Sequence, residues 1–184
     1  NTAMSSDFRE FLDFLGDVVT LKDWPFYRGG LDVKTNTTGE KSLFTKFLDY
    51  DIMFHVGAFL PHGEGEQQLG KKRHIGNDIV VIVFKERTCE DALFDPSIFV
   101  SDFNHIFVLV EKMQNEQLKT LREKKVLSSF DDAKTYYRVG FCSKQGVHSA
   151  QPLLPFPGIF EKNDNFRHFL LTKVLNSERS ALYS

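Results

Sequence analysis

The chemically densest stretch of the sequence covers residues 71–78, which read Lys-Lys-Arg-His-Ile-Gly-Asn-Asp. Three cations precede a histidine there, and the asparagine carboxamide at position 77 can accept and donate hydrogen bonds at the same time. Clustered cations suit an acidic partner surface, because opposite charges favour specific association. The same pattern also fits a solvated basic turn that ends on Gly76, and spacing alone favours this plainer interpretation.

A phosphate-binding loop is imitated just upstream, where residues 65–72 match the pattern GxxxxGK. A genuine loop needs a serine or threonine after the lysine to hold Mg²⁺, and this chain has Lys72 there. Glu66 would also bring negative charge toward the phosphates, and Lys85 rather than an aspartate ends the next apolar run. We therefore expect the chain to bind no nucleotide of its own.

No metal or cofactor site is expected. Several acidic and histidine side chains lie close together in the sequence, but their spacing matches neither HExxH nor a closed zinc pattern. His55 alternates with apolar residues, which favours a core histidine, and neither cysteine lies in a recognisable catalytic turn. The side chains considered are Asp51, His55, His62, Glu64, His74, Cys89 and Cys142.

The bulk composition indicates one globular domain over residues 1–184. Hydrophobic residues make up 41% and the net charge is only −2, which gives no reason to expect nucleic-acid binding. The 2 cysteines lack CxxC spacing, and no apolar run approaches the roughly 20 residues of a membrane helix, so we expect a cytoplasmic protein. Because the chain starts at Asn1 rather than methionine, we interpret it as a fragment of a longer protein.

Hydrophobic periodicity predicts the elements that position the basic stretch. An amphipathic helix is expected over residues 8–15, with Ser5 or Ser6 as N-cap, and a short exposed helix over 66–73. Residues 111–130 are polar and charged enough for a helical or disordered surface insertion. Together the elements predict an α/β fold with a mixed central β-sheet flanked by helices. Strands are expected over 43–60, 79–84, 103–110 and 136–142, and a C-terminal amphipathic helix begins over 166–174.

Four segments of the sequence together resemble the Rap GTPase-activating protein family, and they occur in the family's order. They are Arg-Gly-Gly-Leu-Asp at 28–32, Ile-Met-Phe-His-Val at 52–56, Gln-Gln-Leu at 67–69 and Lys-Arg-His-Ile-Gly-Asn-Asp-Ile-Val at 72–80. The resemblance extends over nearly the whole chain and implies a Rap-GAP catalytic domain with an α/β fold somewhat like that of a small G protein.

The resemblance also implies roles for particular side chains. Asn77 corresponds to the family's "asparagine thumb", which a helix presents to the nucleotide of the partner. Lys72, Arg73 and His74 correspond to residues that contact the GTPase or hold the thumb in place. The partner is then a Rap-type small GTPase that carries GTP and Mg²⁺, and the chain is a GTPase activator in signal transduction rather than an enzyme by itself.

An asparagine suits this role because Rap-type GTPases, as the family implies, lack the glutamine with which most small G proteins orient the attacking water. The Asn77 carboxamide can orient that water while donating toward phosphate oxygens. An aspartate could only accept, and it would add negative charge beside the γ-phosphate.

Other functions stay open at this point. An activator could instead lend an arginine finger such as Arg73, and a silent domain could bind a G protein without stimulating it. The intact thumb motif favours the first function. Related domains act on Rheb or Ral, so the exact GTPase is open, as is homodimerisation through regions outside this chain.

Overall fold

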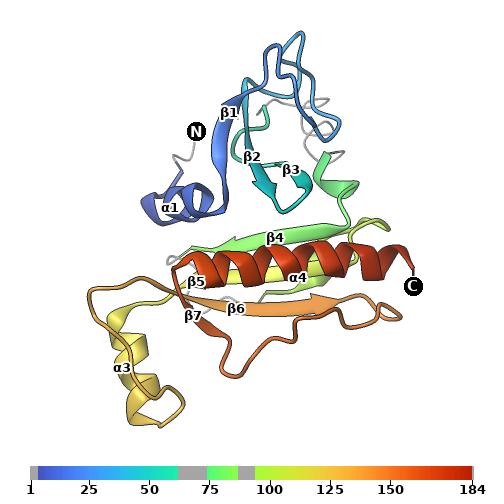
Figure 1. Ribbon diagram of the computed structural model, residues 1–184. Helices are drawn as coiled ribbons and strands as arrows, with labels where there is room; N and C mark the ends of the chain where they lie inside the picture. Colours follow the sequence, from blue (N-terminus) through green and yellow to red (C-terminus); the bar gives the residue numbers. More distant parts are fainter. Residues whose placement is uncertain (1–3, 62–73, 87–93, 184) are drawn as a thin grey trace. The chain divides into compact units, whose positions relative to one another are not determined.

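The computed structural model describes residues 4–61, 74–86 and 94–183. Contacts within the chain group it into two compact units, Asn1–Asp78 and Ile79–Ser184 (Figure 1). Each unit is described by itself. Among the described residues, no helix combines the length and the apolar character needed to cross a bilayer.

The first unit begins with helix α1, Ser6–Leu15, as the sequence predicts. Ser5 is its N-cap, since the Oγ atom accepts a hydrogen bond from the backbone N–H of Phe8 at 3.1 Å. The helix ends at Gly16, where a Cβ atom would lie only 2.5 Å from the carbonyl oxygen of Phe44. A side chain cannot fit there, so the glycine lets the chain pass directly from the helix into the sheet.

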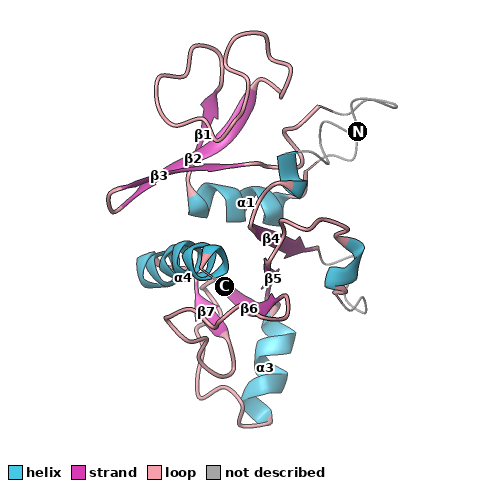
Figure 2. Cartoon of the chain, turned by 90° about the vertical axis from the view of Figure 1, so that its right-hand side faces the viewer, coloured by secondary structure: helices cyan, strands magenta, loops and turns pink. Residues whose placement is uncertain are grey.

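A three-stranded antiparallel sheet follows, built from β1 Asp17–Thr20, β2 Lys41–Phe47 and β3 Tyr50–Phe54 in the order β1-β2-β3 (Figure 2). The prediction of one strand over 43–60 is therefore wrong, because the chain reverses at Leu48, which has a φ of 52°. The strand β3 is an edge strand that ends at Phe54, immediately before His55.

One hydrophobic cluster joins the sheet of this unit to the segments around it. Its buried members are Leu21, Leu31, Met53 and Leu60, and the partly buried Val19, Trp24, Phe44 and Ile75 pack against them. The segment between β1 and β2 and the segment after β3 therefore share one core with the sheet.

The second unit contains a four-stranded mixed sheet in the order β4-β5-β6-β7. The strands are β4 Val80–Lys85, β5 Ile106–Lys112, β6 Tyr136–Ser143 and β7 Ile159–Glu161; β4 and β5 are parallel and the other pairs antiparallel. The short 3₁₀ helix η2, Pro96–Ile98, lies between β4 and β5 in the chain. Helix α4, Asp164–Leu182, packs on β4 and β5 (Figure 1). The α/β class is thus confirmed, with an antiparallel sheet in one unit and a mixed sheet in the other.

The predicted surface insertion at 111–130 is partly strand and partly helix. The strand β5 extends to Lys112, and helix α3 covers Asn115–Glu123. Leu118 is buried with Met113 and Tyr136, so one face of the charged helix is anchored in a small core.

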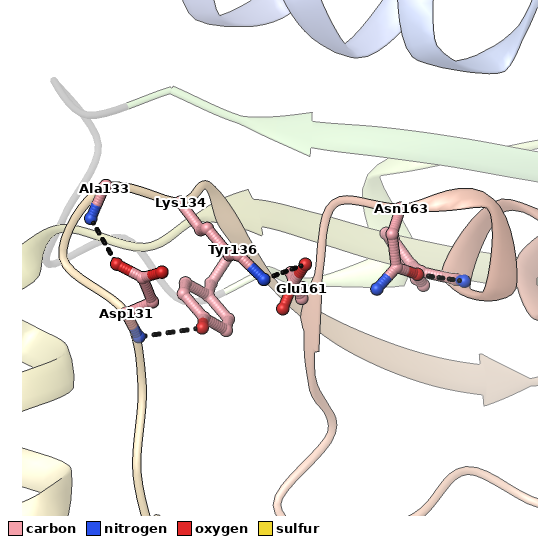
Figure 3. A network of polar contacts seen from close by, with 7 residues as sticks. Asp131, Ala133, Lys134, Tyr136, Glu161 and Asn163 are labelled. Carbon is pink, nitrogen blue, oxygen red and sulfur yellow. Dashed lines mark hydrogen bonds and ion pairs between the residues drawn. The ribbon is translucent and has the colours of Figure 1, made fainter.

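Polar contacts fix the chain on both sides of β6 (Figure 3). The Tyr136 hydroxyl accepts from the backbone N–H of Asp131 at 3.0 Å, and Lys134 Nζ lies 2.9 Å from Glu161 Oε1. Asn163 caps α4 by accepting from a backbone N–H in its first turn at 3.0 Å. These bonds fix the segment before β6, the end of β7 and the start of α4.

Candidate functional site

Asn77 lies at the end of a helical segment, directly after residues 74–76. Its backbone N–H donates to the carbonyl of His74 at 3.2 Å, and the N–H of Asp78 donates to the carbonyl of Ile75 at 3.2 Å. These bonds close the last turn, while Ile75 packs into the core of the unit. The backbone of Asn77 is therefore fixed, but its side chain is exposed to solvent.

The residue after Asn77 is held by a histidine from a distant part of the chain. His55 Nδ1 lies 2.9 Å from Asp78 Oδ2, and His55 Nε2 lies 2.7 Å from the carbonyl oxygen of Gly29. We call these three residues and their two hydrogen bonds the Gly29–His55–Asp78 network. The His55 side chain is only 10% exposed, so the network forms a largely buried support next to Asn77.

Both nitrogens of His55 face oxygen atoms that can only accept. A neutral imidazole has one N–H, so it would leave one nitrogen lone pair pointing at an oxygen, whereas an imidazolium donates to both. Burial of the ring lowers the pKa of His55. The hydrogen bond and charge of Asp78 and the backbone acceptors at Gly29 and His74 raise the pKa by more than burial lowers it. The pKa therefore lies above its ordinary value of 6.5. The arrangement thus favours the doubly protonated ring.

Gly29 can reach His55 because it has no side chain. Its φ is +56°, and a Cβ atom there would lie 3.2 Å from the Cβ of Met53 and 3.4 Å from His55 Nε2. The loop closes just after it, where the N–H of Leu31 donates to the carbonyl of Arg28 at 3.0 Å. Leu31 is buried, so the Arg-Gly-Gly-Leu segment is fixed to the core while it presents the Gly29 carbonyl.

Asp32 organises the loop that follows this segment. Its carboxylate accepts from the backbone N–H groups of Lys34, Thr35 and Thr37 and from the hydroxyls of both threonines. The hydrogen bonds from Thr35, with those from Lys34 and Thr37, hold the pKa of Asp32 far below its usual range. This aspartate therefore stabilises a loop rather than offering a titratable group.

The candidate residues predicted from the sequence are only partly within the described chain. Asn77 and His74 are described, and the half-buried His74 ring lies edge-on to the His55 ring with centroids 5.4 Å apart. Lys72 and Arg73 lie outside the described residues, as do the predicted helix at 66–73 and the imitation of a phosphate loop.

Sequence reasoning treated His55 as a core histidine and assigned no role to Gly29 or Asp78. The structure shows a mostly buried ring, but one whose two nitrogens are both used in hydrogen bonds. One signal in the sequence could have linked them: Gly29, His55 and Asp78 lie in three different segments that resemble the family, at 28–32, 52–56 and 72–80.

Among the described residues, no group of three or more histidine, cysteine, aspartate or glutamate side chains could hold a metal ion. His62, Glu64 and Cys89, which the sequence analysis considered, lie outside this part of the chain. The network at His55 contains two ring nitrogens and one carboxylate, and hydrogen bonding already uses them.

Comparisons with known proteins agree over the full length of the chain. The model of the Rap/ran-GAP family matches residues 1–184. GTPase-activating Rap/Ran-GAP domain-like protein 3 of Mus musculus is 42% identical over 183 residues, covering 99% of this chain and 16% of the relative. RapA guanosine triphosphatase-activating protein 1 of Dictyostelium discoideum is 35% identical over 223 residues, covering 100% of this chain and 21% of the relative.

This chain thus spans only a small part of the length of these relatives. Among solved structures, the GAP domain of TSC2 matches with a TM-score of 0.78 at 26% identity, covering 100% of this chain and 86% of that one. The match includes both compact units and the segment that carries Asn77. With a family model matching from the first residue to the last, the chain belongs to the Rap/ran-GAP family.

Proposed function

We propose that this chain is a GTPase-activating domain that stimulates GTP hydrolysis by a Rap-type small GTPase and supplies Asn77 to the partner's active site. The observation that carries the proposal is the contrast at Asn77. Its side chain is exposed, yet Ile75 on one side is packed in the core and Asp78 on the other is bound to His55. A side chain presented on a fixed base suits action on a second molecule.

The chemistry of the carboxamide fits that role. Hydrolysis of GTP needs a water molecule aligned with the γ-phosphate and donors for the charge that develops there. The Asn77 oxygen can orient the water and its NH₂ group can donate, without adding charge beside the phosphates. GTP and Mg²⁺ belong to the partner, so the chain completes an active site rather than containing one.

The neighbouring residues divide into support and docking. We assign His74 to support, because its ring packs against that of His55 and its carbonyl accepts from the N–H of Asn77. Lys72 and Arg73 are assigned to attraction of an acidic partner surface, where charge matters more than the fork geometry of a guanidinium. We expect the protein in the cytoplasm, together with the small GTPases on which we propose that it acts.

Two other functions deserve an experimental comparison. The exact GTPase is one question, and Rheb and Ral are the alternatives to Rap. The chemical role is the other, since Arg73 could act as an arginine finger, or the domain could bind a GTPase without stimulating it. The support beneath Asn77 favours a catalytic asparagine over a domain that only binds, because binding alone does not require a fixed carboxamide.

The test is single-turnover hydrolysis of GTP by Rap, Rheb or Ral at saturating concentrations of the domain. Asn77→Ala should lose most of the stimulation while it keeps its fold and much of its affinity, because the amide acts mainly in the transition state. Asn77→Asp should fail as well, since it has the same shape but no N–H donors. Circular dichroism and a binding assay on the same samples serve as controls. A folded, saturating Asn77→Ala variant with the wild-type rate would refute the proposal.

A further inference from the structure

The first unit displays a cluster of aromatic side chains that the proposed thumb does not use. The rings of Trp24, Phe26 and Phe44 lie together, with centroid distances of 5.2 Å, 5.0 Å and 6.2 Å, and Tyr27 adjoins them in the chain. Phe26 is 56% exposed and Tyr27 is 58% exposed. We call these four residues the aromatic patch. Contiguous exposed apolar patches mark interaction sites, and aromatic side chains are enriched at protein interfaces.

The aromatic patch is built on a fixed base. Trp24 packs against the core of the unit, and its Nε1–H donates to the carbonyl of Tyr27 at 3.1 Å. The loop is tied at its start as well, since the N–H of Asp23 donates to the carbonyl of Val33 at 3.0 Å and the N–H of Trp24 to that of Leu21 at 3.0 Å. Preordered aromatic side chains lose little conformational entropy when a partner covers them, which is a property of efficient anchor residues.

The aromatic patch is linked to the support of Asn77 through the chain and two hydrogen bonds. Tyr27 precedes Gly29 by two residues, and the Gly29 carbonyl accepts from His55, which also binds Asp78 beside Asn77. Standard bond lengths and hydrogen-bond distances make this path at most about 25 Å long. A protein interface of ordinary size covers about 800 Å² of each partner, which is a patch about 30 Å across. Tyr27 of the aromatic patch and Asn77 are therefore close enough together for one partner of ordinary size to reach both.

We propose that the aromatic patch is a docking surface for the same small GTPase whose hydrolysis Asn77 stimulates. This inference rests on the proposed function. The occupant is the apolar part of the switch surface of the GTPase, which the γ-phosphate of GTP orders and which adjoins the bound nucleotide. Phe26 and Tyr27 supply affinity for the GTP-bound form, while Asn77 supplies the rate.

The test separates affinity from rate. Phe26→Ala/Tyr27→Ala removes two exposed rings and leaves Trp24 and Phe44 in place, so the fold should be retained. We measure the Kd for Rap loaded with a non-hydrolysable GTP analogue, and the single-turnover rate as a function of domain concentration. The Kd should rise between about tenfold and a hundredfold, as for aromatic anchor residues, and the rate at saturation should stay within about twofold of wild type. Asn77→Ala should show the opposite behaviour.

Leu48→Ala is the matched control, since Leu48 is 64% exposed in the same unit but lies at the other end of β3 from His55. It should leave both quantities unchanged. An unchanged Kd in the Phe26→Ala/Tyr27→Ala variant would overturn the inference even if Asn77 is confirmed. It would also be overturned if sedimentation showed a wild-type dimer that this variant abolishes, because the patch would then be covered by a second copy. A wild-type domain that stimulates none of the three GTPases refutes the proposed function instead.

Discussion

Asp78→Asn is the sharpest test of the idea that a buried histidine holds Asn77 in place. The substitution keeps the size of the side chain and an oxygen that can accept from His55 Nδ1, but it removes the negative charge. His55 then lacks the charge that favours its imidazolium form. Asn77 itself is unchanged, so any loss of activity must come from its support.

The expected magnitude follows from the exposure of the pair. The His55 side chain is 10% exposed and that of Asp78 is 33% exposed, so solvent screens part of the interaction. Hydrogen bonds to charged groups contribute about 1.5–3 kcal/mol when they are buried, and with the screening we expect a loss of about 1–2 kcal/mol. In a chain of this size each kcal/mol corresponds to a fall in Tm of about 2–4 °C. A misplaced Asn77 should also lower the saturating rate of GTP hydrolysis by about tenfold or more.

The effect should depend on pH in a defined direction. The pKa of His55 is raised above 6.5 in the folded state. Its charged form therefore makes its full contribution to stability when the pH is below 6.5, the pKa in the unfolded chain. That contribution is lost as the pH rises through the higher, folded pKa. Wild type and Asp78→Asn should thus differ most below pH 6.5, and the difference in Tm should shrink as the pH rises through the raised, folded-state pKa of His55.

Thermal unfolding at a series of pH values checks the expected changes in Tm. The saturating rate of GTP hydrolysis is measured separately, and the pH dependence of the partner's own hydrolysis is subtracted from it. Asp51→Asn is the matched control, because Asp51 lies in the same unit and is about as exposed as Asp78, but its ion-pair partner at 3.7 Å is the exposed Lys46 rather than a buried histidine. It should change Tm by less than about 2 °C at any of these pH values. A wild-type Tm for Asp78→Asn at pH 6, or a difference that grows with pH, would refute the reasoning.

Three further predictions concern other contacts. Gly29→Ala should lower the free energy of unfolding, measured by denaturant titration, by about 2–3 kcal/mol, because the new methyl group is crowded and the φ is positive. Gly30→Ala has a positive φ but open space around it, so it should lower the free energy of unfolding by only about 1 kcal/mol. Arg138→Met should lower the free energy of unfolding by about 1–3 kcal/mol, because it leaves the largely buried Glu111 carboxylate unpaired. In a double-mutant cycle, adding Glu111→Gln should restore part of that stability. Arg73→Lys should keep most of the saturating rate; a lysine variant as inactive as Arg73→Ala, with binding intact, would establish an arginine finger.

The elements that depend on local pattern were predictable from the sequence. Helix α1 carries a serine cap, a spaced apolar face and a terminal glycine, and β4 is an unbroken apolar run up to Phe84. The prediction failed at the β2–β3 hairpin, because the turn at Leu48 lacks the glycine or asparagine that usually marks a reversal. Apolar residues on both sides of that turn continued the pattern, and two strands looked like one.

The sequence indicates a position for the candidate site but not the arrangement of the residues around it. Asn77 was identified through its motif, whereas its support depends on Gly29, His55 and Asp78, which are separated by more than 20 residues at each step. No periodicity encodes such contacts, because they form only when the loop, the end of β3 and the helical turn share one core. His55 illustrates the point, since alternation with apolar residues indicated its burial but not the two acceptors that raise its pKa.

The proposed separation of a catalytic Asn77 side chain from its support has an energetic reason. Fixing the backbone of a residue costs about 1–2 kcal/mol, so ordering residues 76–78 only when the partner arrives would cost about 3–6 kcal/mol. Stimulation of Ras by its activator, about 10⁵-fold, corresponds to roughly 7 kcal/mol, so that cost would cancel much of a comparable effect. In this chain the ordering is complete before binding, through Ile75 in the core and the Gly29–His55–Asp78 network. An exposed asparagine without that network would keep its carboxamide but lose the fixed geometry that the proposed function requires.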